Sequence, residues 1–317
     1  MRVAPSIDVV VPVHDRYELT RACLTHLAAQ SEPHRVIVVD DGSSDGTPER
    51  LRSEWPQVTV VSLEGNQGFA SACNRGAKEG SGELVVLLNN DVECEPAFLE
   101  RLRRPFADPR VGSVATLMLR PGGEAIDSAG LATDVTLAGF PRQQGLPAAA
   151  AGDEDPVLAG PAGAAAGYRR AAWEQVGGLD EGLVAYMEDL DLALRLRIAG
   201  WSAVLASDAV GVHLGSATYG RRGKRQRRLA GFSRGYLLRR YGVLHGRAAL
   251  RALATESIVV AGDLVISHDL AALQGRLAGW RAAANGARQL VAPPQAIDRS
   301  IGLRESLHLR RGIYGSD

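Results

Sequence analysis

Residues 84–92 have the sequence LVVLLNNDV, an unbroken apolar run that ends in two amides and a carboxylate. The run lies between Gly82 and Pro96, and its length is typical of a parallel strand covered on both faces. Ligands of such sheets bind beyond the carboxyl ends of the strands. The stretch therefore predicts a buried strand that delivers Asp91 to a binding edge.

Asp91 has two interpretations. A carboxylate at this edge could hold Mg²⁺ or Mn²⁺, which prefer oxygen ligands and share themselves with substrate phosphates. Asn-Asn-Asp after a strand is also ordinary turn chemistry, and on this tripeptide alone a turn is favoured.

The pattern of strand, polar turn and helix occurs four times in the first 107 residues. Strict alternation of this kind implies a parallel sheet with right-handed crossovers. The expected strands cover residues 7–13, 36–39, 58–63 and 84–88, and the expected helices 17–30, 48–55, 68–79 and 95–107. After a further apolar stretch at 111–119, residues 120–167 are rich in Gly, Ala and Pro without sustained periodicity. This composition indicates an open, partly mobile region.

Composition indicates a soluble globular protein, with 317 residues of which 45% are hydrophobic and 23% charged. The formal net charge of zero gives no global argument for nucleic acid. Cys23, Cys73 and Cys94 are odd in number and far apart, which fits structural thiols in a reduced compartment. No apolar run approaches the roughly 18 residues of a membrane helix, and the start lacks a secretory signal. These features favour the cytoplasm.

Two later segments carry candidate chemistry. Residues 187–196 are predicted to open a helix with Glu188, Asp189 and Asp191 in its first turn, where the helix dipole favours negative charge. These residues are either ordinary caps or catalytic carboxylates. A strand predicted at 202–212 ends in His213, which is either a structural histidine or a ligand.

Residues 221–240 contain nine Lys or Arg residues and no acidic residue, interleaved with apolar and aromatic side chains. Such a basic amphipathic segment is a solvated helix face, a phosphate-binding face or a surface for anionic membranes. The chain to about residue 284 is also predicted to be helical.

Seven motifs stand in an order and spacing that resemble a family of known enzymes. They are residues 9–14 (VVVPVH), 38–47 (VVDDGSSDGT), 66–70 (NQGFA), 87–91 (LLNND), 177–181 (GGLDE), 188–191 (EDLD) and His213. The chain resembles the inverting, nucleotide-sugar-dependent family 2 glycosyltransferases over about residues 6–245. The resemblance is closest to the rhamnosyltransferase-like branch, whose chains also carry the Gly-Gly-x-Asp-Glu turn and a basic segment after the histidine.

The resemblance implies an α/β fold of the GT-A type, a Rossmann-like and mostly parallel sheet flanked by helices. It assigns residues 1–220 to the glycosyltransferase domain and leaves residues 221–317 as a basic helical extension. Implied activity is the transfer of a sugar, with rhamnose the first expectation, from a pyrimidine nucleoside diphosphate to an acceptor hydroxyl in glycan, cell-wall or glycoconjugate synthesis. Expected donors are dTDP-rhamnose and then a UDP-sugar, and expected acceptors are a glycan, a lipid-linked molecule or a small molecule. Peripheral association with the inner membrane face is expected from the basic segment, and nucleic acid is not an expected partner.

The family roles fall on matching positions. Asp41 would accept hydrogen bonds from the pyrimidine ring, and Asp189 would be the general base. Asn90 and Asp91 stand where the family has its Asp-x-Asp element, with an amide in place of the first carboxylate. Asp91 is the implied ligand of Mg²⁺ or Mn²⁺, and His213 could complete the shell. The implied substrate-binding residues are Pro12, Val13, Asp41, Asn66, Asn90 and Glu188.

Glu188 and Asp191 could position the acceptor or hold the helix start, and sequence alone does not separate these roles. Two other classes compete with a transferase. A sugar-phosphate nucleotidyltransferase would carry a glycine-rich phosphate loop after the first strand, but residues 12–16 (PVHDR) contain no glycine. A nucleotide-sugar-binding protein without turnover would lack the base or the metal ligand, and Asp189 and Asp91 are both present.

Overall fold

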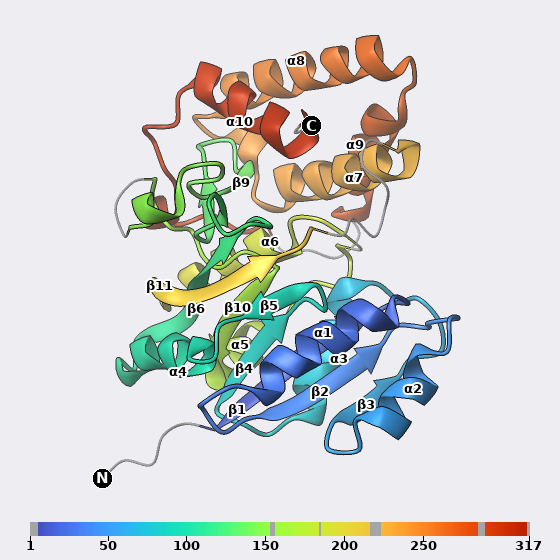
Figure 1. Ribbon diagram of the computed structural model, residues 1–317. Coiled ribbons are helices and arrows are strands. Elements are labelled where there is room, and N and C mark those ends of the chain that lie inside the picture. The colour runs from blue at the N-terminus through green and yellow to red at the C-terminus, as the bar shows by residue number, and fades with distance from the viewer. Residues whose placement is uncertain (1–5, 153–155, 184, 216–222, 285–288, 316–317) are drawn as a thin grey trace.

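The computed structural model describes residues 6–152, 156–183, 185–215, 223–284 and 289–315 of the chain (Figure 1). One nine-stranded sheet has the strand order β3-β2-β1-β4-β10-β6-β11-β5, with β7 paired to β6. The strands of this sheet are β1 (Ile7–Val13), β2 (Arg35–Asp40), β3 (Thr59–Ser62), β4 (Leu84–Leu88), β5 (Val92–Cys94), β6 (Val111–Leu119), β7 (Ile126–Ser128), β10 (Ala165–Arg169) and β11 (Ser202–His213). The mostly parallel α/β prediction is confirmed.

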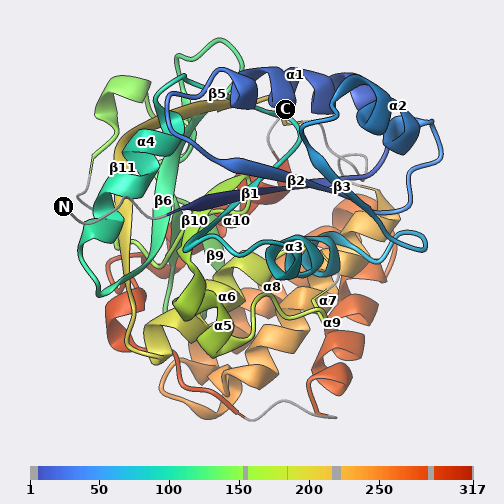
Figure 2. The ribbon, with the colours of Figure 1, turned by 90° about the horizontal axis from the view of Figure 1, so that it is seen from below.

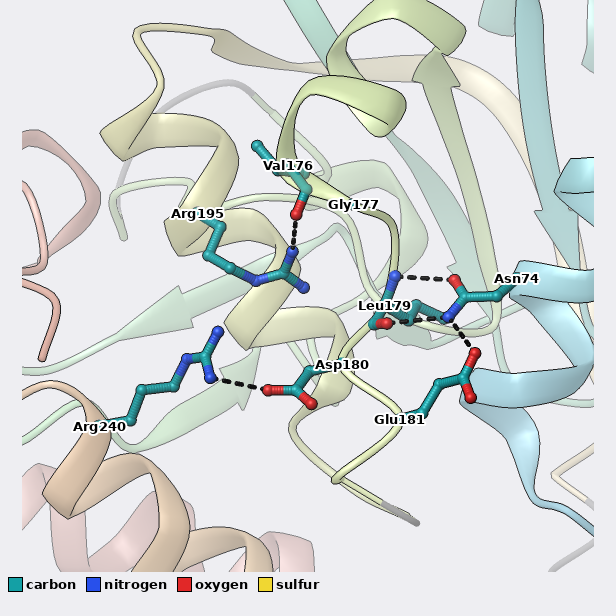
Figure 3. A pocket seen from close by; sticks show the side chains of 8 residues that line it. All are labelled: Asn74, Val176, Gly177, Leu179, Asp180, Glu181, Arg195 and Arg240. Atoms are coloured by element: carbon teal, nitrogen blue, oxygen red, sulfur yellow. Dashed lines mark hydrogen bonds and ion pairs between the residues drawn. The ribbon is translucent and has the colours of Figure 1, made fainter. Parts of the chain in front are cut away.

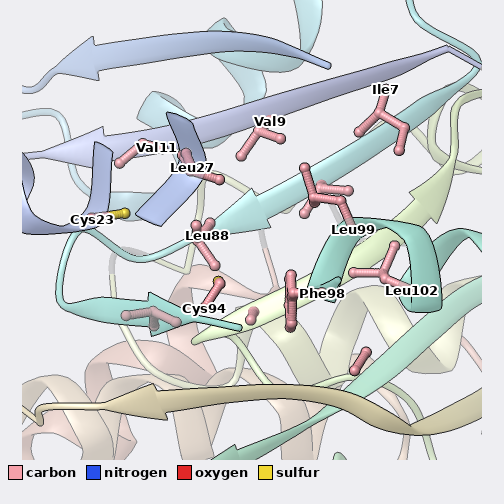
Figure 4. Close-up of a cluster of buried hydrophobic side chains, with 14 of the residues drawn as sticks. Ile7, Val9, Val11, Cys23, Leu27, Leu88, Cys94, Phe98, Leu99 and Leu102 are labelled. Carbon is pink, nitrogen blue, oxygen red and sulfur yellow. The ribbon is translucent and has the colours of Figure 1, made fainter. Parts of the chain in front are cut away.

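Strands β1 to β4 are mutually parallel, as predicted, and β1, most of β2 and β4 are buried, whereas the edge strand β3 is half-buried. Side chains alternate along β1, so Val9 and Val11 face one core and Val10 faces the other. The first core lies under α1 (Tyr17–Ala28) and α4 (Phe98–Arg103) and is drawn in Figure 4. The second lies against α3 (Phe69–Glu79), α5 (Arg170–Val176) and α6 (Glu188–Ile198), and Figure 2 shows the sheet between these two helical layers.

The second half of the sheet departs from β-α alternation. Strand β10 is inserted antiparallel between β4 and β6, while β11 runs parallel to β6. The helix expected at 95–107 is shorter, because α4 begins after Pro96 and gives way to a 3₁₀ turn at Arg104–Ala107, which contains Pro105. The remaining helix of the N-terminal half is α2 (Thr47–Glu54).

The prediction of an open region at 120–167 is wrong. Besides β7 and β10, this region forms β8 (Leu131–Thr133) and β9 (Gly139–Pro141), which pair with each other. Arg142 is fully buried and donates to the carbonyls of Pro156 (2.6 Å) and Gly152 (3.0 Å). Strands of three residues are too short to show a repeating pattern of apolar and polar residues, so the sequence of this region gives no sign of its structure.

Four helices follow β11, namely α7 (Lys224–Arg240), α8 (Ala249–Ser267), α9 (Ala271–Ala282) and α10 (Leu303–Gly315). The backbones of helices α7 and α9 are in direct contact at glycine positions. A Cβ added to Gly235 would lie 2.0 Å from the carbonyl oxygen of Arg276, and one added to Gly279 would lie 1.9 Å from the carbonyl oxygen of Phe232, so neither position has room for a side chain. The basic segment predicted at 221–240 is therefore mostly α7. Its second half packs in the interior rather than forming a solvated face, and residues 221–222 lie outside the described residues.

A buried ionic cluster joins these four helices to the rest of the protein. Glu256 on α8 lies 2.7–2.8 Å from guanidinium nitrogens of Arg234, Arg276 and Arg310. Arg234 is 1% exposed and also donates to the carbonyls of Thr136 and Leu137, both at 2.7 Å. Burial raises the pKa of Glu256, but the three arginine charges outweigh it and hold that pKa well below its usual range.

No helix in the described part of the chain is long and apolar enough to cross a membrane.

Candidate active site

The loops that follow β1, β2 and β3 meet at the carboxyl end of the sheet. The Asp41 carboxylate is buried and accepts hydrogen bonds from the backbone N–H groups of Gln67 (2.6 Å) and Gly68 (2.9 Å), just before α3. The N–H of Asp41 donates to the carbonyl of Val13 at 2.7 Å. The structure thus brings together four predicted substrate-binding residues, Pro12, Val13, Asp41 and the exposed Asn66. Asp41 keeps unused lone pairs, since a carboxylate offers about four.

Asn90 and Asp91 follow β4 but face different neighbours. The side-chain nitrogen of Asn90 donates to the hydroxyl of Thr20 on α1 at 3.0 Å, so this amide holds the strand end against a helix. Asp91 is 6% exposed, and its carbonyl accepts a bond from the N–H of Leu214, just after β11. The end of β11 is therefore held beside the end of β4.

His213, the last residue of β11, lies between two carboxylates. Its Nε2 is 3.4 Å from Oδ1 of Asp91, and its Nδ1 is 2.8 Å from Oδ2 of Asp127. Burial lowers the pKa of His213, but the hydrogen bonds and charges of Asp127 and Asp91 together raise it to about 9. Asp127 was not found from the sequence, because it lies on the three-residue strand β7 in a region without a readable pattern.

The predicted metal ligands Asp91 and His213 are neighbours in the structure. Two ligand atoms that each lie about 2.0–2.2 Å from a cation, at right angles to each other, are about 3 Å apart. Nε2 of His213 and Oδ1 of Asp91 are 3.4 Å apart, which is close to this separation. Asp127 contacts the other ring nitrogen, as carboxylates do behind metal-bound histidines. Within the described ranges, no three His, Cys, Asp or Glu side chains form a group that could hold a metal. The pair therefore fits two positions of a cation that takes its other ligands from substrate and water.

The start of α6 places a carboxylate pair. Tyr186 and Met187, which precede it, have φ of 66° and 65°, a left-handed conformation that costs non-glycine residues energy and is common at functional sites. Asp189 is partly exposed and accepts hydrogen bonds from the N–H groups of Gly163 (3.0 Å) and Leu190 (2.8 Å). Burial raises the pKa of the Asp189 carboxyl despite these two bonds.

Glu188 is the buried member of this pair. Burial and then the charge of Asp189 raise the pKa of Glu188 to about 8. Its Oε2 is buried and makes no hydrogen bond. A buried carboxyl with an unused oxygen is costly, and such groups are found where a ligand or a proton is handled.

Asp191, the third acidic residue of this helix start, has a different role. It is fully buried and pairs with Arg195 (2.6 Å) and Arg240 (3.0 Å), and it accepts a hydrogen bond from the hydroxyl of Tyr241 at 2.9 Å. These contacts anchor α6 to the end of α7. The structure therefore separates Asp191, a structural residue, from Glu188 and Asp189.

Two successive residues before β10 connect the strand-end group to the carboxylate pair. The N–H of Asn89 donates to the carbonyl of Ala164 at 2.9 Å, and the N–H of Gly163 donates to Asp189. Burial raises the pKa of the Cys73 thiol on α3, and the charges of Glu188 and Asp41 raise it further. All three cysteines are buried free thiols, as expected.

The Gly-Gly-x-Asp-Glu turn forms a wall of a polar cavity of about 370 Å³ (Figure 3). Asn74 on α3 holds the turn through three bonds of 2.9 Å, to both backbone groups of Leu179 and to the carboxylate of Glu181. Asp180 pairs with Arg240 at 2.8 Å. The acidic residues of this motif therefore fix the turn that leads into α6.

Solved glycosyltransferases have a similar fold. A mannosyltransferase from Pyrobaculum calidifontis, solved with GDP-Man and Mn²⁺, superposes with a TM-score of 0.54 at 21% identity, over 89% of this chain and 86% of that one. GalNAc-T7, solved with UDP, GalNAc and Mn²⁺, superposes with a TM-score of 0.62 at 15% identity, over 98% of this chain and 58% of that one. These likenesses show that the chain has the GT-A fold.

The sequence model of glycosyl transferase family 2 matches residues 8–177, more than half of the chain, and the protein belongs to this family. It is 30% identical over 217 residues to an N-acetylglucosaminyl-diphospho-decaprenol L-rhamnosyltransferase of Mycobacterium tuberculosis, covering 61% of this chain and 70% of that protein. It is 31% identical over 237 residues to the O-antigen biosynthesis protein RfbC of Myxococcus xanthus, covering 69% of this chain but only 18% of that protein. The predicted family and its rhamnosyltransferase-like branch are confirmed.

Proposed function

We propose that the protein is an inverting, metal-dependent glycosyltransferase that moves a sugar from a pyrimidine nucleoside diphosphate to an acceptor hydroxyl in glycan or cell-wall synthesis. The observation that carries this proposal is the carboxylate pair Glu188–Asp189, which is connected through residues 163–164 to the end of β4. On one side of the site, Asp91 and His213 could hold a cation beside a diphosphate. On the other side, the Asp189 carboxylate could accept a proton from a hydroxyl. The two sides together suit a reaction between a diphosphate and a hydroxyl.

Asp189 is the proposed general base. Backbone bonds from Gly163 and Leu190 orient its carboxylate, and its raised pKa brings its basicity nearer to neutral pH. Glu188 is the more deeply buried member, and burial raises its pKa, so the proton of the pair would sit on Glu188 and leave Asp189 as the charged member. Asp189 would take the proton of the acceptor hydroxyl as this attacks the anomeric carbon opposite the diphosphate, and inversion follows from that direction of attack.

The leaving diphosphate is the proposed partner of Asp91 and His213. A bound Mg²⁺ or Mn²⁺ would supply positive charge against the negative charge that builds on the leaving group. Asp91 and His213 would hold the cation, and Asp127 would fix the histidine ring through Nδ1. The Mn²⁺ in the two solved glycosyltransferases supports a divalent cation here.

The proposed donor is dTDP-rhamnose first and a UDP-sugar second, supported by similarity to the mycobacterial rhamnosyltransferase. Asp41, Asn66 and the backbone at Pro12 and Val13 would bind the nucleotide. The decaprenol in that relative's name supports a lipid-linked acceptor, which would bring the reaction to the inner face of a membrane. Residues 1–220 would carry the reaction, and residues 221–317 would form the basic helical extension.

Calorimetry and a donor screen test this proposal. Asp91→Ala should abolish the Mn²⁺-dependent part of nucleoside diphosphate binding, whereas Asp208→Ala, which removes an exposed carboxylate on β11, should leave it unchanged. A screen of labelled donors should show release of nucleoside diphosphate and a product of inverted anomeric configuration. Full turnover in excess chelator would refute the metal, and binding without turnover of any donor would favour a non-catalytic nucleotide-sugar-binding protein.

A further inference from the structure

The zero net charge of this chain conceals a strong asymmetry. Residues 1–220 contain 18 Lys or Arg against 30 Asp or Glu, a formal charge of −12. Residues 221–317 contain 18 against 6, a formal charge of +12. Charge placed in this way directs one end of a molecule toward an anionic partner.

Helix α8, which belongs to the basic part, has its charged residues on the inside. Arg251 is 3.4 Å from Asp134, Asp263 is 3.4 Å from Arg227, and Glu256 lies in the arginine cluster. These are all the charged residues of α8. The face that packs on the protein is therefore ionic, which is the reverse of an ordinary surface helix.

The opposite side, which we call the outward face of α8, is apolar and exposed. Leu250 is 84% exposed and Val265 is 71% exposed. Ile266, which lies beside this face, is 80% exposed. At 100° per residue the face covers roughly 140° of the helix and contains no charge. Its members are Leu250, Leu253, Ala254, Ser257, Ile258, Ala261, Leu264 and Val265. In Figure 1, α8 lies at the edge of the molecule farthest from β1 and β2.

Exposed basic residues accompany this face. Arg247 precedes α8 by less than one turn, and Arg304 is on α10, which α8 contacts through Glu256 and Arg310. Lys224 and Arg228 are exposed at the start of α7, which is tied to α8 through Arg227 and Asp263. Glu305 is the one acidic residue in the described part of 223–310 whose side chain is exposed.

We propose that the outward face of α8 binds an anionic lipid surface. A wide apolar helix face on a segment with a formal charge of +12 suits a helix that lies in the plane of a membrane interface, with its apolar residues below the headgroups and the basic segment drawn to the anionic surface. A second copy of this chain is disfavoured as the occupant, because it would bring one +12 segment against another. The inference concerns a face of α8 that contributes no residue to the candidate site, and it stands without the proposed reaction.

Vesicle sedimentation tests the proposal with the whole chain. The probe is vesicles of phosphatidylcholine with phosphatidylglycerol, at low and high salt, compared with phosphatidylcholine alone. The test variant is Leu250→Ser combined with Val265→Ser, and the matched control is Leu146→Ser combined with Ile198→Ser, which removes two exposed apolar residues outside the C-terminal helices. Because all four side chains are exposed, these substitutions should not change the melting temperature. Melting temperatures equal to that of the wild-type chain will confirm that both variants are folded.

We expect the wild-type chain to bind the anionic vesicles and to keep part of its binding in high salt, because apolar contacts are not screened. The α8 variant should lose at least about tenfold in vesicle partitioning in high salt, and the control should stay within about twofold. Failure of the wild-type chain to bind, or equal binding by the two variants, would overturn the proposal. A wild-type dimer that the α8 variant alone dissociates would assign the face to a second copy. Release of nucleoside diphosphate without vesicles reports separately on the proposed reaction.

Discussion

Asp189→Asn removes the proposed base with the smallest change in shape. The wild-type carboxylate accepts two backbone N–H groups, from Gly163 and Leu190, whereas an amide has one oxygen to accept either of them. One donor is left facing an NH₂ group at a partly exposed site, a cost of about 1 kcal/mol. Loss of the charge beside Glu188 offsets part of this cost. The melting temperature should therefore fall by no more than about 2–4 °C.

Turnover should change far more than stability. An amide cannot accept the acceptor's proton, so the transfer rate should fall by roughly 10²–10⁴ while nucleoside diphosphate binding is retained. The assay combines melting, calorimetry with nucleoside diphosphate and Mn²⁺, and steady-state transfer, with Asp208→Asn as the matched control. A variant that melts normally, binds the nucleotide and transfers sugar at nearly the wild-type rate would refute Asp189 as the base.

Three further predictions concern groups whose environments are unusual. Glu188→Gln should gain stability relative to wild type as the pH rises from 5 to 8 in thermal melts, by up to about 1.4 kcal/mol per pH unit, because the wild-type carboxyl, whose pKa is raised to about 8 in the folded protein, keeps a proton there that it loses on unfolding; equal pH profiles would contradict this. Asp127→Asn should weaken Mn²⁺ binding in the presence of UDP by about 10–100-fold in calorimetry, and an unchanged affinity would limit Asp127 to a structural contact with His213. Glu256→Gln should lower the free energy of unfolding in urea by about 3–5 kcal/mol, because three guanidinium groups lose their buried partner. The control Glu305→Gln, at an exposed position, should change it by less than about 0.5 kcal/mol, and equal losses in the two variants would contradict the stabilising role of the cluster.

The part of the fold that the sequence predicted is the part built by local pattern. Apolar runs of strand length and amphipathic helices alternate from β1 to α4, and the polar loops after β1, β2 and β4 stand where the ends of parallel strands must meet. Strand β10 could not be predicted in this way. Its five residues, AAGYR, have no alternation of apolar and polar residues, and its place between β4 and β6 is set by pairing partners about 50 and 80 positions away in the chain.

The candidate site divides along the same line. The residues predicted to form the site stand at strand and helix ends, where local sequence patterns apply. Asp127 and Gly163 act through contacts with His213 and Asp189, which are 86 and 26 positions away, so no spacing rule could identify them. Asp191 and Glu188 look alike in sequence, and only the packing of Arg240 and Tyr241 against Asp191 distinguishes them.

The connection through Gly163 and Ala164 has a consequence for how such an enzyme can diversify. These neighbours bond to the two halves of the site, Ala164 to the end of β4 and Gly163 to Asp189, and consecutive Cα atoms are about 3.8 Å apart whatever the rest of the chain does. The end of β4 and Asp189 are thus hydrogen-bonded to two residues that are joined by a single peptide bond, which limits how far apart they can move. Helices after α7 can lengthen, shorten or change their chemistry to suit another acceptor while the proposed reacting groups keep their separation.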